Sequence, residues 1–214
     1  MLIPTVGESV TGSPRSSADT WRNVLDGQLR LQALCVVRDI ANRLKDPERS
    51  AELALAARTN STVLSNWSWH PASIVGGNAG WAIFFGQLDA CFPGEGWDRI
   101  AHVHLSEAAT WLKAHGPIQP GLFGGLTGLC FATWFLSRNG TRYQNLLSSL
   151  EQQLCRQIMS DPNLATAPDS LSSFSNYDVI SGSAGIGAYL LLRHDAPGLK
   201  EITLKVMDHV LGLS

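Results

Sequence analysis

The chain has 214 residues, with 16 Lys and Arg against 18 Asp and Glu, so its formal net charge is -2. Sequence-independent nucleic-acid binding needs a basic surface, and this charge balance argues against a nucleic-acid partner. Only 16% of the residues are charged, below the roughly 25% usual in soluble domains, and 44% are hydrophobic, so we expect a large buried core.

The apolar runs are short, and Leu129 to Leu136 is among the longest. A membrane span needs roughly 18 or more apolar residues, so we expect none. The N-terminus shows no basic segment followed by an apolar stretch, which predicts no secretory signal and a cytoplasmic location. The four cysteines lie far apart inside apolar patterns, which favours reduced, buried thiols over a disulfide framework; they are Cys35, Cys91, Cys130 and Cys155.

Residues 1–18 are rich in Ser, Gly, Pro and Thr, which predicts a flexible lead-in before a domain of residues 19–214. Apolar residues then recur every three or four positions up to Leu44, as in a long amphipathic helix. Asp46 and Pro47 end this helix, and Pro47 suits the first position of a second one, where its missing N–H costs nothing.

Three copies of a Gly-x-x-Gly motif follow, and each opens an apolar run. The motif glycines are Gly77 with Gly80, Gly125 with Gly128, and Gly182 with Gly185. The first glycines of successive copies are 48 and 57 residues apart, a period typical of helical-pair repeats. Each apolar run precedes a segment with a single apolar stripe, so each copy predicts a helical hairpin; the repeats cover about residues 73–115, 120–158 and 177–213.

The two helices of each predicted hairpin differ in polarity, which indicates their layers. The first helix is apolar on all sides and is expected in the inner layer, whereas the second has a polar, solvent-facing side and is expected in the outer layer. The expected fold class is therefore all-α, with two helical layers. Converging helix N-termini would also direct free N–H groups toward an anionic ligand. The alternative is that the glycines only allow tight packing in a helical solenoid that binds another protein.

The motif segments resemble the first three glycine motifs of the lanthionine synthetase C-like family; they read SIVGGNAG from Ser73, PGLFGGLTGL from Pro120 and YDVISGSAGIG from Tyr177. The resemblance extends from about Ser73 to the C-terminus. It implies a double-layered α/α toroid, of which this chain would form an incomplete half. It also implies the activity of the lantibiotic cyclases, which join Cys thiols to dehydrated Ser or Thr residues of a precursor peptide.

The resemblance further implies a zinc ion, because zinc-bound sulfur is held as the nucleophilic thiolate. Family members bind this zinc through two Cys and one His from later repeats, including an adjacent Cys-His pair. The present sequence contains no such pair. We therefore expect no metal site and no cofactor in this chain, with zinc present only when a missing C-terminal half is supplied.

The expected protein is thus the N-terminal part of a lanthionine synthetase C-like protein, a fragment that is inactive alone. A toroid of hairpins closes only when the last repeat packs against the first, so three repeats leave two open flanks. The expected partners are the dehydrated precursor peptide and either a C-terminal half or a second copy that covers these flanks. The alternative is a non-catalytic helical-repeat module that binds peptides.

Asp178 is the catalytic residue that the resemblance implies, as a group that assists proton transfer during thiol addition. Its alternative role is that of a turn or N-cap residue before the third inner helix. Tyr177 is expected to pack at the same turn, and it joins the six motif glycines as a candidate for lining the substrate cavity. A glycoside hydrolase is disfavoured, because Asp178 has no carboxylate partner at the matching place in the other repeats.

The remaining histidines and tryptophans carry weaker predictions. His102 and His104 point in different directions on a helix and are expected at the surface or an interface, and His209 is expected to pack inside. His194 is expected at a helix C-terminus, where the helix dipole favours a cation. The tryptophans near the first motif, Trp67, Trp69 and Trp81, are core residues or, if a cavity exposes them, contacts for a peptide.

Overall fold

The structure is a computed structural model that describes residues 25–60, 70–161 and 177–211. Every regular element within these ranges is an α-helix, which confirms the all-α prediction. None of the helices in these ranges is long and apolar enough to span a membrane. The chain divides into two compact units, Met1–Asp39 and Ile40–Ser214, and α1 (Gly27–Leu44) begins in the first unit and ends in the second.

The second helix, α2 (Pro47–Thr59), begins where the sequence predicts it. Pro47 occupies its first turn, and the Asp46 carboxylate accepts a hydrogen bond of 3.0 Å from the backbone N–H of Arg49. This is an N-cap, which satisfies one of the N–H groups that a helix start leaves without a partner.

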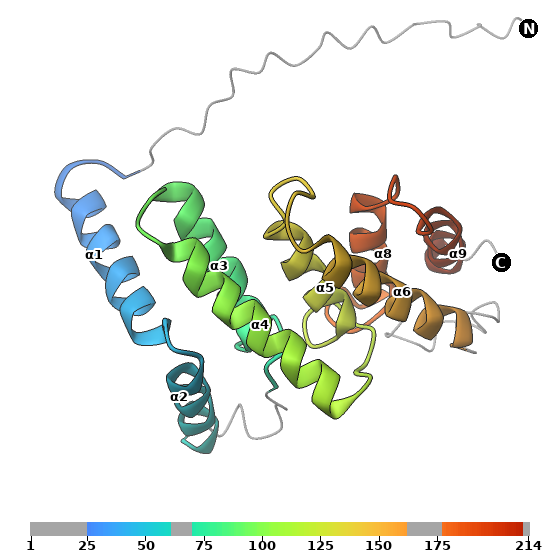
Figure 1. The fold of residues 1–214 in the computed structure, drawn as a ribbon, viewed down its shortest axis with the longest axis horizontal. Helices are drawn as coiled ribbons and strands as arrows, with labels where there is room; N and C mark the ends of the chain where they lie inside the picture. The colour runs from blue at the N-terminus through green and yellow to red at the C-terminus, as the bar shows by residue number, and fades with distance from the viewer. Residues whose placement is uncertain (1–24, 61–69, 162–176, 212–214) are drawn as a thin grey trace, which may run out of the picture. The chain divides into compact units, whose positions relative to one another are not determined.

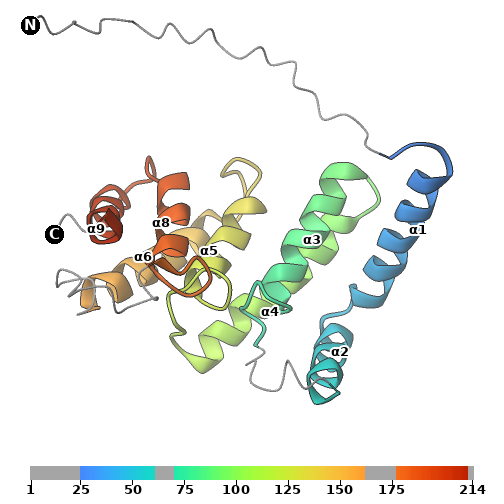
Figure 2. The ribbon, with the colours of Figure 1, turned by 180° about the vertical axis from the view of Figure 1, so that it is seen from behind.

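Three helical hairpins follow in the second unit, and in each of them the two helices pack against one another (Figure 1). The hairpins are α3 (Asn78–Cys91) with α4 (Trp97–His115), α5 (Leu126–Phe135) with α6 (Gln144–Ser160), and α8 (Ser183–Leu192) with α9 (Lys200–Leu211). The first helices form a row in which α5 contacts both α3 and α8 (Figure 2). The second helices lie outside this row, and α6 contacts α5 and α9.

The inner row is apolar because its helices are covered from more than one side. Helices α5 and α8 contain no charged residue, and Asp89 is the only one in α3. Leu129 and Leu190 of the inner row are fully buried, as is Leu154 of α6. The single-striped outer helices thus cover the inner row, as the sequence predicts, whereas closure of a toroid stays a prediction.

A buried ion pair joins the second and third hairpins. Glu151 of α6 is 7% exposed, and its carboxylate accepts hydrogen bonds from the Tyr189 hydroxyl at 2.6 Å and from Arg193 Nε at 2.9 Å. Burial, together with the nearby Glu151 charge, raises the pKa of Tyr189, so the phenol remains a donor. The hydrogen bond to Glu151 raises the pKa of Arg193, so both partners of the carboxylate keep their protons.

A buried histidine ties the first hairpin to the end of α1. His104 is fully buried, and its Nε2 lies 2.9 Å from the Leu44 carbonyl while its Nδ1 lies 3.2 Å from Asn78 Oδ1. Its ring also stacks on Phe85. Burial lowers its pKa to about 4, so the imidazole is neutral near pH 7 and Nε2 carries the proton. The prediction of a surface or interface position for His104 is therefore wrong, because inside the core its Nε2–H donates to the Leu44 backbone carbonyl and its ring packs on Phe85.

Candidate functional site

The three glycine motifs form loops that lead directly into α3, α5 and α8. Each of these helices has a motif glycine as its N-cap, and none of the three caps has a side-chain hydrogen bond; the caps are Gly77, Gly125 and Gly182. The loop that precedes each cap is called here the first, second or third glycine loop, over residues 70–77, 119–125 and 178–182. Since the inner helices are neighbours, the three loops meet at one end of the hairpins.

Backbone hydrogen bonds join the three loops side by side. The N–H groups of Ile74 and Val75 donate to the Phe123 carbonyl at 2.9 and 3.3 Å, and the Phe123 N–H donates to the Ile180 carbonyl at 2.9 Å. The second loop is therefore bonded on both sides. This ladder of backbone bonds fixes the spacing of the loops independently of their side chains.

Two side chains of the first loop add to its contact with the second. Ser73 Oγ donates to the Phe123 carbonyl at 3.1 Å, and His70 Nε2 lies 2.9 Å from the Gly124 carbonyl. Because a carbonyl oxygen only accepts, His70 Nε2 must carry the proton in this bond.

The second position of each motif must be glycine, because the preceding loop passes very close to the backbone of the helix at this point. A Cβ atom at this position would collide with the carbonyl oxygen of the residue six positions earlier, in all three copies. The glycines and the residues whose carbonyls they face are Gly80 with Ile74, Gly128 with Leu122, and Gly185 with Val179. The repeat is therefore a repeat of backbone geometry as well as of sequence.

The loop carbonyls occupy the first N–H groups of two inner helices. At α3, the N–H of Ala79 donates to the Pro71 carbonyl at 3.0 Å; at α5, the N–H of Leu126 donates to the Gln119 carbonyl at 2.8 Å. The expectation of free N–H groups for an anionic ligand is wrong at these two helices. The chain itself supplies the acceptors that such a ligand would offer.

A hollow of about 530 Å³, called here the glycine-loop hollow, opens beside the paired loops. Each loop contributes to its wall, together with residues 117–119; the loop residues are His70 and Val75, Phe123 and Gly124, and Ile180 and Ser181. The wall is thus mixed, with apolar side chains from all three loops, an imidazole at the first loop, a hydroxyl at the third and the Gln119 amide between them. Such a surface suits a peptide better than a highly charged ligand.

His70 is the residue of this hollow whose chemistry the sequence does not reveal. Its ring stacks on Trp111 at 5.0 Å, and its buried Nδ1 has no hydrogen-bond partner among the described residues. Burial lowers the pKa of His70, although its hydrogen bond to Gly124 acts in the opposite direction. The neutral ring therefore keeps an unprotonated Nδ1 near pH 7, and this buried atom is an acceptor for which the described residues supply no donor.

Asp178 holds the turn of the third loop. Its carboxylate accepts hydrogen bonds from the N–H groups of Ile180 at 2.8 Å and Ser181 at 3.0 Å, and both of these residues line the glycine-loop hollow. The residue thus has the turn-forming role that is the alternative to catalysis. Each carboxylate oxygen retains a further lone pair, so the turn does not exhaust its capacity to accept a proton.

The other predicted cavity residues lie apart from the hollow wall. Tyr177 is 64% exposed, so it does not pack at the turn as expected. The motif glycines form the helix starts behind the loops, where most of them contact loop carbonyls; they are Gly77, Gly80, Gly125, Gly128, Gly182 and Gly185. Contact of these residues with a substrate stays a prediction.

The described residues do not fit the zinc ion that the family resemblance implies. Within residues 25–60, 70–161 and 177–211, no group of three or more His, Cys, Asp and Glu side chains could hold a metal. Burial raises the pKa of Cys130 well above that of an ordinary thiol, so this sulfur remains protonated and is a poor metal ligand. Cys35 and Cys91 are free but exposed, which corrects the expectation of four buried thiols.

The remaining aromatic and histidine predictions have mixed outcomes. His209 is 3% exposed, as expected for a packed residue, and His194 Nδ1 lies 2.9 Å from the Leu191 carbonyl at the end of α8. His102 is exposed, as expected, and its Nδ1 lies 3.0 Å from the Tyr143 hydroxyl. Trp81 is partly buried, whereas Trp67 and Trp69 lie outside the described residues.

Comparison with known proteins matches the region that contains the glycine loops. A family model described as lanthionine synthetase C-like protein matches residues 68–211. The nisin biosynthesis protein NisC of Lactococcus lactis subsp. lactis is 34% identical over 89 residues, which cover 39% of this chain and 20% of NisC. The match thus spans about a fifth of that relative's length.

Proposed function

Because the chain belongs to the lanthionine synthetase C-like family, we propose that it takes part in forming thioether rings on a precursor peptide that carries Cys and dehydrated Ser or Thr residues. Its similarity to a nisin biosynthesis protein supports a peptide as the substrate. The observation that carries the proposal is the set of three joined glycine loops, which line one hollow with both apolar and polar groups, with the Asp178 turn beside it.

The proposed reaction is an addition in which no atom is lost. The sulfur of a Cys residue bonds to Cβ of the dehydrated residue, the Cα=Cβ double bond becomes single, the thiol proton leaves sulfur, and Cα gains a proton. We assign both proton transfers to Asp178: its carboxylate takes the thiol proton and then, as a carboxyl group, delivers this proton to Cα, so the residue ends the reaction in the form in which it began. The wall of the hollow would hold the peptide near this group.

The metal chemistry of the family requires ligands from elsewhere. The sequence has no adjacent Cys-His pair, and the described residues offer no three-ligand site. The proposal is therefore that other residues, from another chain or a further segment, complete the site in the cytoplasm.

A ring-closure assay on the protein as its own cells make it tests this proposal. The tagged protein is purified with any chains that accompany it and is mixed with a synthetic peptide that contains one dehydroalanine and one Cys. Ring closure leaves the peptide mass unchanged but removes its free thiol, so alkylation followed by mass spectrometry measures it. We expect the thiol to disappear, and we expect Asp178→Ala to slow its loss by about a hundredfold or more.

The Lys200→Ala variant is the matched control, because this exposed residue of α9 lies away from the glycine-loop hollow. It should close the ring at the wild-type rate. Equal rates for Asp178→Ala and Lys200→Ala would remove Asp178 from the reaction.

The alternative function is a peptide-binding module without catalysis. The observation that favours it is that both carboxylate oxygens of Asp178 already accept backbone hydrogen bonds. If the peptide binds but keeps its thiol with every chain that accompanies the protein present, this alternative is correct.

A further inference from the structure

A second concave surface lies between the outer helices of the first two hairpins. This groove of about 830 Å³, called here the α4–α6 groove, is lined by the last turns of α4, by residues 116–117 and by one face of α6. Leu112, Leu146 and Leu150 contribute its apolar part, and Leu112 and Leu150 are also core residues with 6% and 4% exposure. The floor of the groove is therefore held rigidly by the hairpin core.

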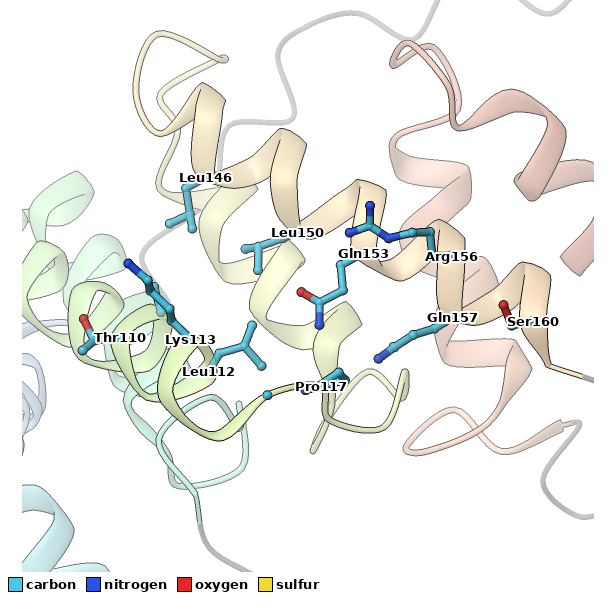
Figure 3. A pocket seen from close by; sticks show the side chains of 12 residues that line it. Thr110, Leu112, Lys113, Pro117, Leu146, Leu150, Gln153, Arg156, Gln157 and Ser160 are labelled. Carbon is cyan, nitrogen blue, oxygen red and sulfur yellow. The ribbon is translucent and has the colours of Figure 1, made fainter.

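The charged side chains that line the α4–α6 groove are all basic. Lys113 stands on the α4 wall and Arg156 on the α6 wall, and both are exposed (Figure 3). No acidic side chain is among the lining residues in the part of the chain that the structure describes. In a protein whose net charge is -2, this surface is selectively positive and favours a ligand with carboxylates.

The groove also contains a buried amide oxygen that receives no hydrogen bond from the described residues. Gln157 Nε2 donates to the Ile118 carbonyl at 3.0 Å, which fixes the orientation of the amide. Its Oε1 is buried and accepts no hydrogen bond from the described residues. Buried acceptors are rarely left unpaired, and a peptide N–H from a bound ligand would satisfy this one. Gln153 and Gln157 both extend from α6 toward the α4 side of the groove (Figure 3).

The α4–α6 groove leads to the glycine-loop hollow. Pro117 and Gln157 line both the groove and a smaller depression of about 410 Å³, which also includes Ile118, Gln119 and the acidic Asp161, so the positive surface is confined to the groove itself. Ile118 and Gln119 in turn line the glycine-loop hollow. The groove, the smaller depression and the hollow therefore follow one another along residues 117–119, and Pro117 lines all three, so one extended peptide could contact each of them in turn.

We propose that the α4–α6 groove binds an acidic segment of the peptide substrate, with carboxylates at Lys113 and Arg156 and apolar side chains on the leucine floor, while another part of the same peptide reaches the glycine-loop hollow. The segment docks the substrate and takes no part in the chemistry. This inference rests on the proposed function for the identity of the peptide, but the groove itself is tested without ring closure.

Fluorescence anisotropy of the 214-residue chain with short labelled peptides tests the docking step. The probe is a fluorescein-labelled peptide of Leu-Glu-Glu repeats, and the comparison peptide has Leu-Lys-Lys repeats. We expect the acidic probe to bind and the basic one not to, and we expect added salt to weaken binding. The double variant Lys113→Glu/Arg156→Glu should raise the Kd of the acidic probe by about tenfold or more.

The control is Arg58→Glu/Lys200→Glu, which changes the net charge equally at exposed positions outside the groove. It should bind the acidic probe with the wild-type Kd, and circular dichroism should show both double variants to be folded. Equal Kd values for the two double variants, or no binding by the wild type, would overturn the proposal. Self-association of the wild type that the groove variant abolishes would assign the groove to a second copy and would also overturn it.

Ring closure separates this inference from the function on which it rests. With a substrate that has an acidic segment, the groove variant should raise KM and leave kcat unchanged. With a substrate that lacks the segment, the groove variant and the wild type should react alike. Absence of ring closure in both proteins would contradict the proposed function, while the anisotropy result would still decide the role of the groove.

Discussion

At the scale of single residues, the carboxylate of Asp178 has two roles: it stabilises the turn of the third loop, and it is proposed to transfer a proton. Two substitutions separate these roles. Asp178→Asn keeps an oxygen that can accept from the Ile180 N–H but loses the charge, whereas Asp178→Ala loses both. We expect Asp178→Asn to unfold near the wild-type Tm yet to close rings about a hundredfold more slowly. Asp178→Ala should lose about 1 kcal/mol of stability in addition.

Thermal unfolding followed by circular dichroism, with the thiol-alkylation assay on the same samples, measures both effects. A slow but stable Asp178→Asn variant supports a chemical role. Full activity of Asp178→Asn would show that the residue serves only the turn.

The second glycine of the middle motif provides a test of the loop geometry. A Cβ at Gly128 would collide with the Leu122 carbonyl and would lie 3.0 Å from Ile74 Cγ1, so Gly128→Ala must displace the second loop. We expect the free energy of unfolding to fall by about 2 kcal/mol, measured by urea denaturation. Gly124→Ala is the control in the same loop, because a Cβ there meets open space. Equal losses for the two variants would refute the close-approach explanation.

At the scale of helices, the Glu151 ion pair links α6 to α8 across two hairpins. Glu151→Gln keeps the shape of the side chain but removes the charge that holds Arg193, which is only 22% exposed. Leaving this guanidinium without its carboxylate should lower the free energy of unfolding by about 2–3 kcal/mol in urea denaturation.

The matched control for this link is Glu52→Gln. It breaks an ion pair with Arg49 in which both side chains are more than 60% exposed. We therefore expect no measurable change in the free energy of unfolding. If both variants were equally stable, the buried pair would not contribute to the packing of the hairpins.

At the scale of the whole molecule, the buried neutral His104 predicts acid sensitivity. Its pKa is about 4 in the folded chain, against an ordinary value near 6.5 when unfolded, so the unfolded chain binds the proton first as the pH falls. The free energy of unfolding should therefore decrease from about pH 6.5 to about pH 4, by up to ~3 kcal/mol from this residue. Above pH 7 the residue is neutral in both states and contributes no pH dependence.

Urea denaturation at several pH values measures this slope, and His104→Asn provides the comparison. The variant cannot titrate, so its stability should change less between pH 6.5 and pH 4 than that of the wild type. Parallel curves for the two proteins would show that His104 does not cause the acid sensitivity.

The hairpins can be predicted from the sequence because each places an all-apolar helix beside a helix with one apolar stripe, as in α5 and α6. The joining of the glycine loops cannot, since the bond between Phe123 and Ile180 uses only backbone atoms and has no side-chain pattern. For the same reason, the sequence does not reveal that loop carbonyls accept hydrogen bonds from the N–H groups at the starts of α3 and α5. His104 is misplaced by sequence reasoning because its partners come from Leu44 and Asn78, on two other elements.

Phe123 has a consequence for how the three loops respond to one another. Its N–H and its C=O belong to successive peptide groups, the first bonded to Ile180 and the second to the Ile74 N–H, so the backbone of one residue spans both contacts between the loops. The two peptide groups turn relative to one another only through φ and ψ of Phe123. A ligand that displaces Ile180 would thus draw the Phe123 backbone with it, and the first loop would register an event at the third through a single pair of dihedral angles.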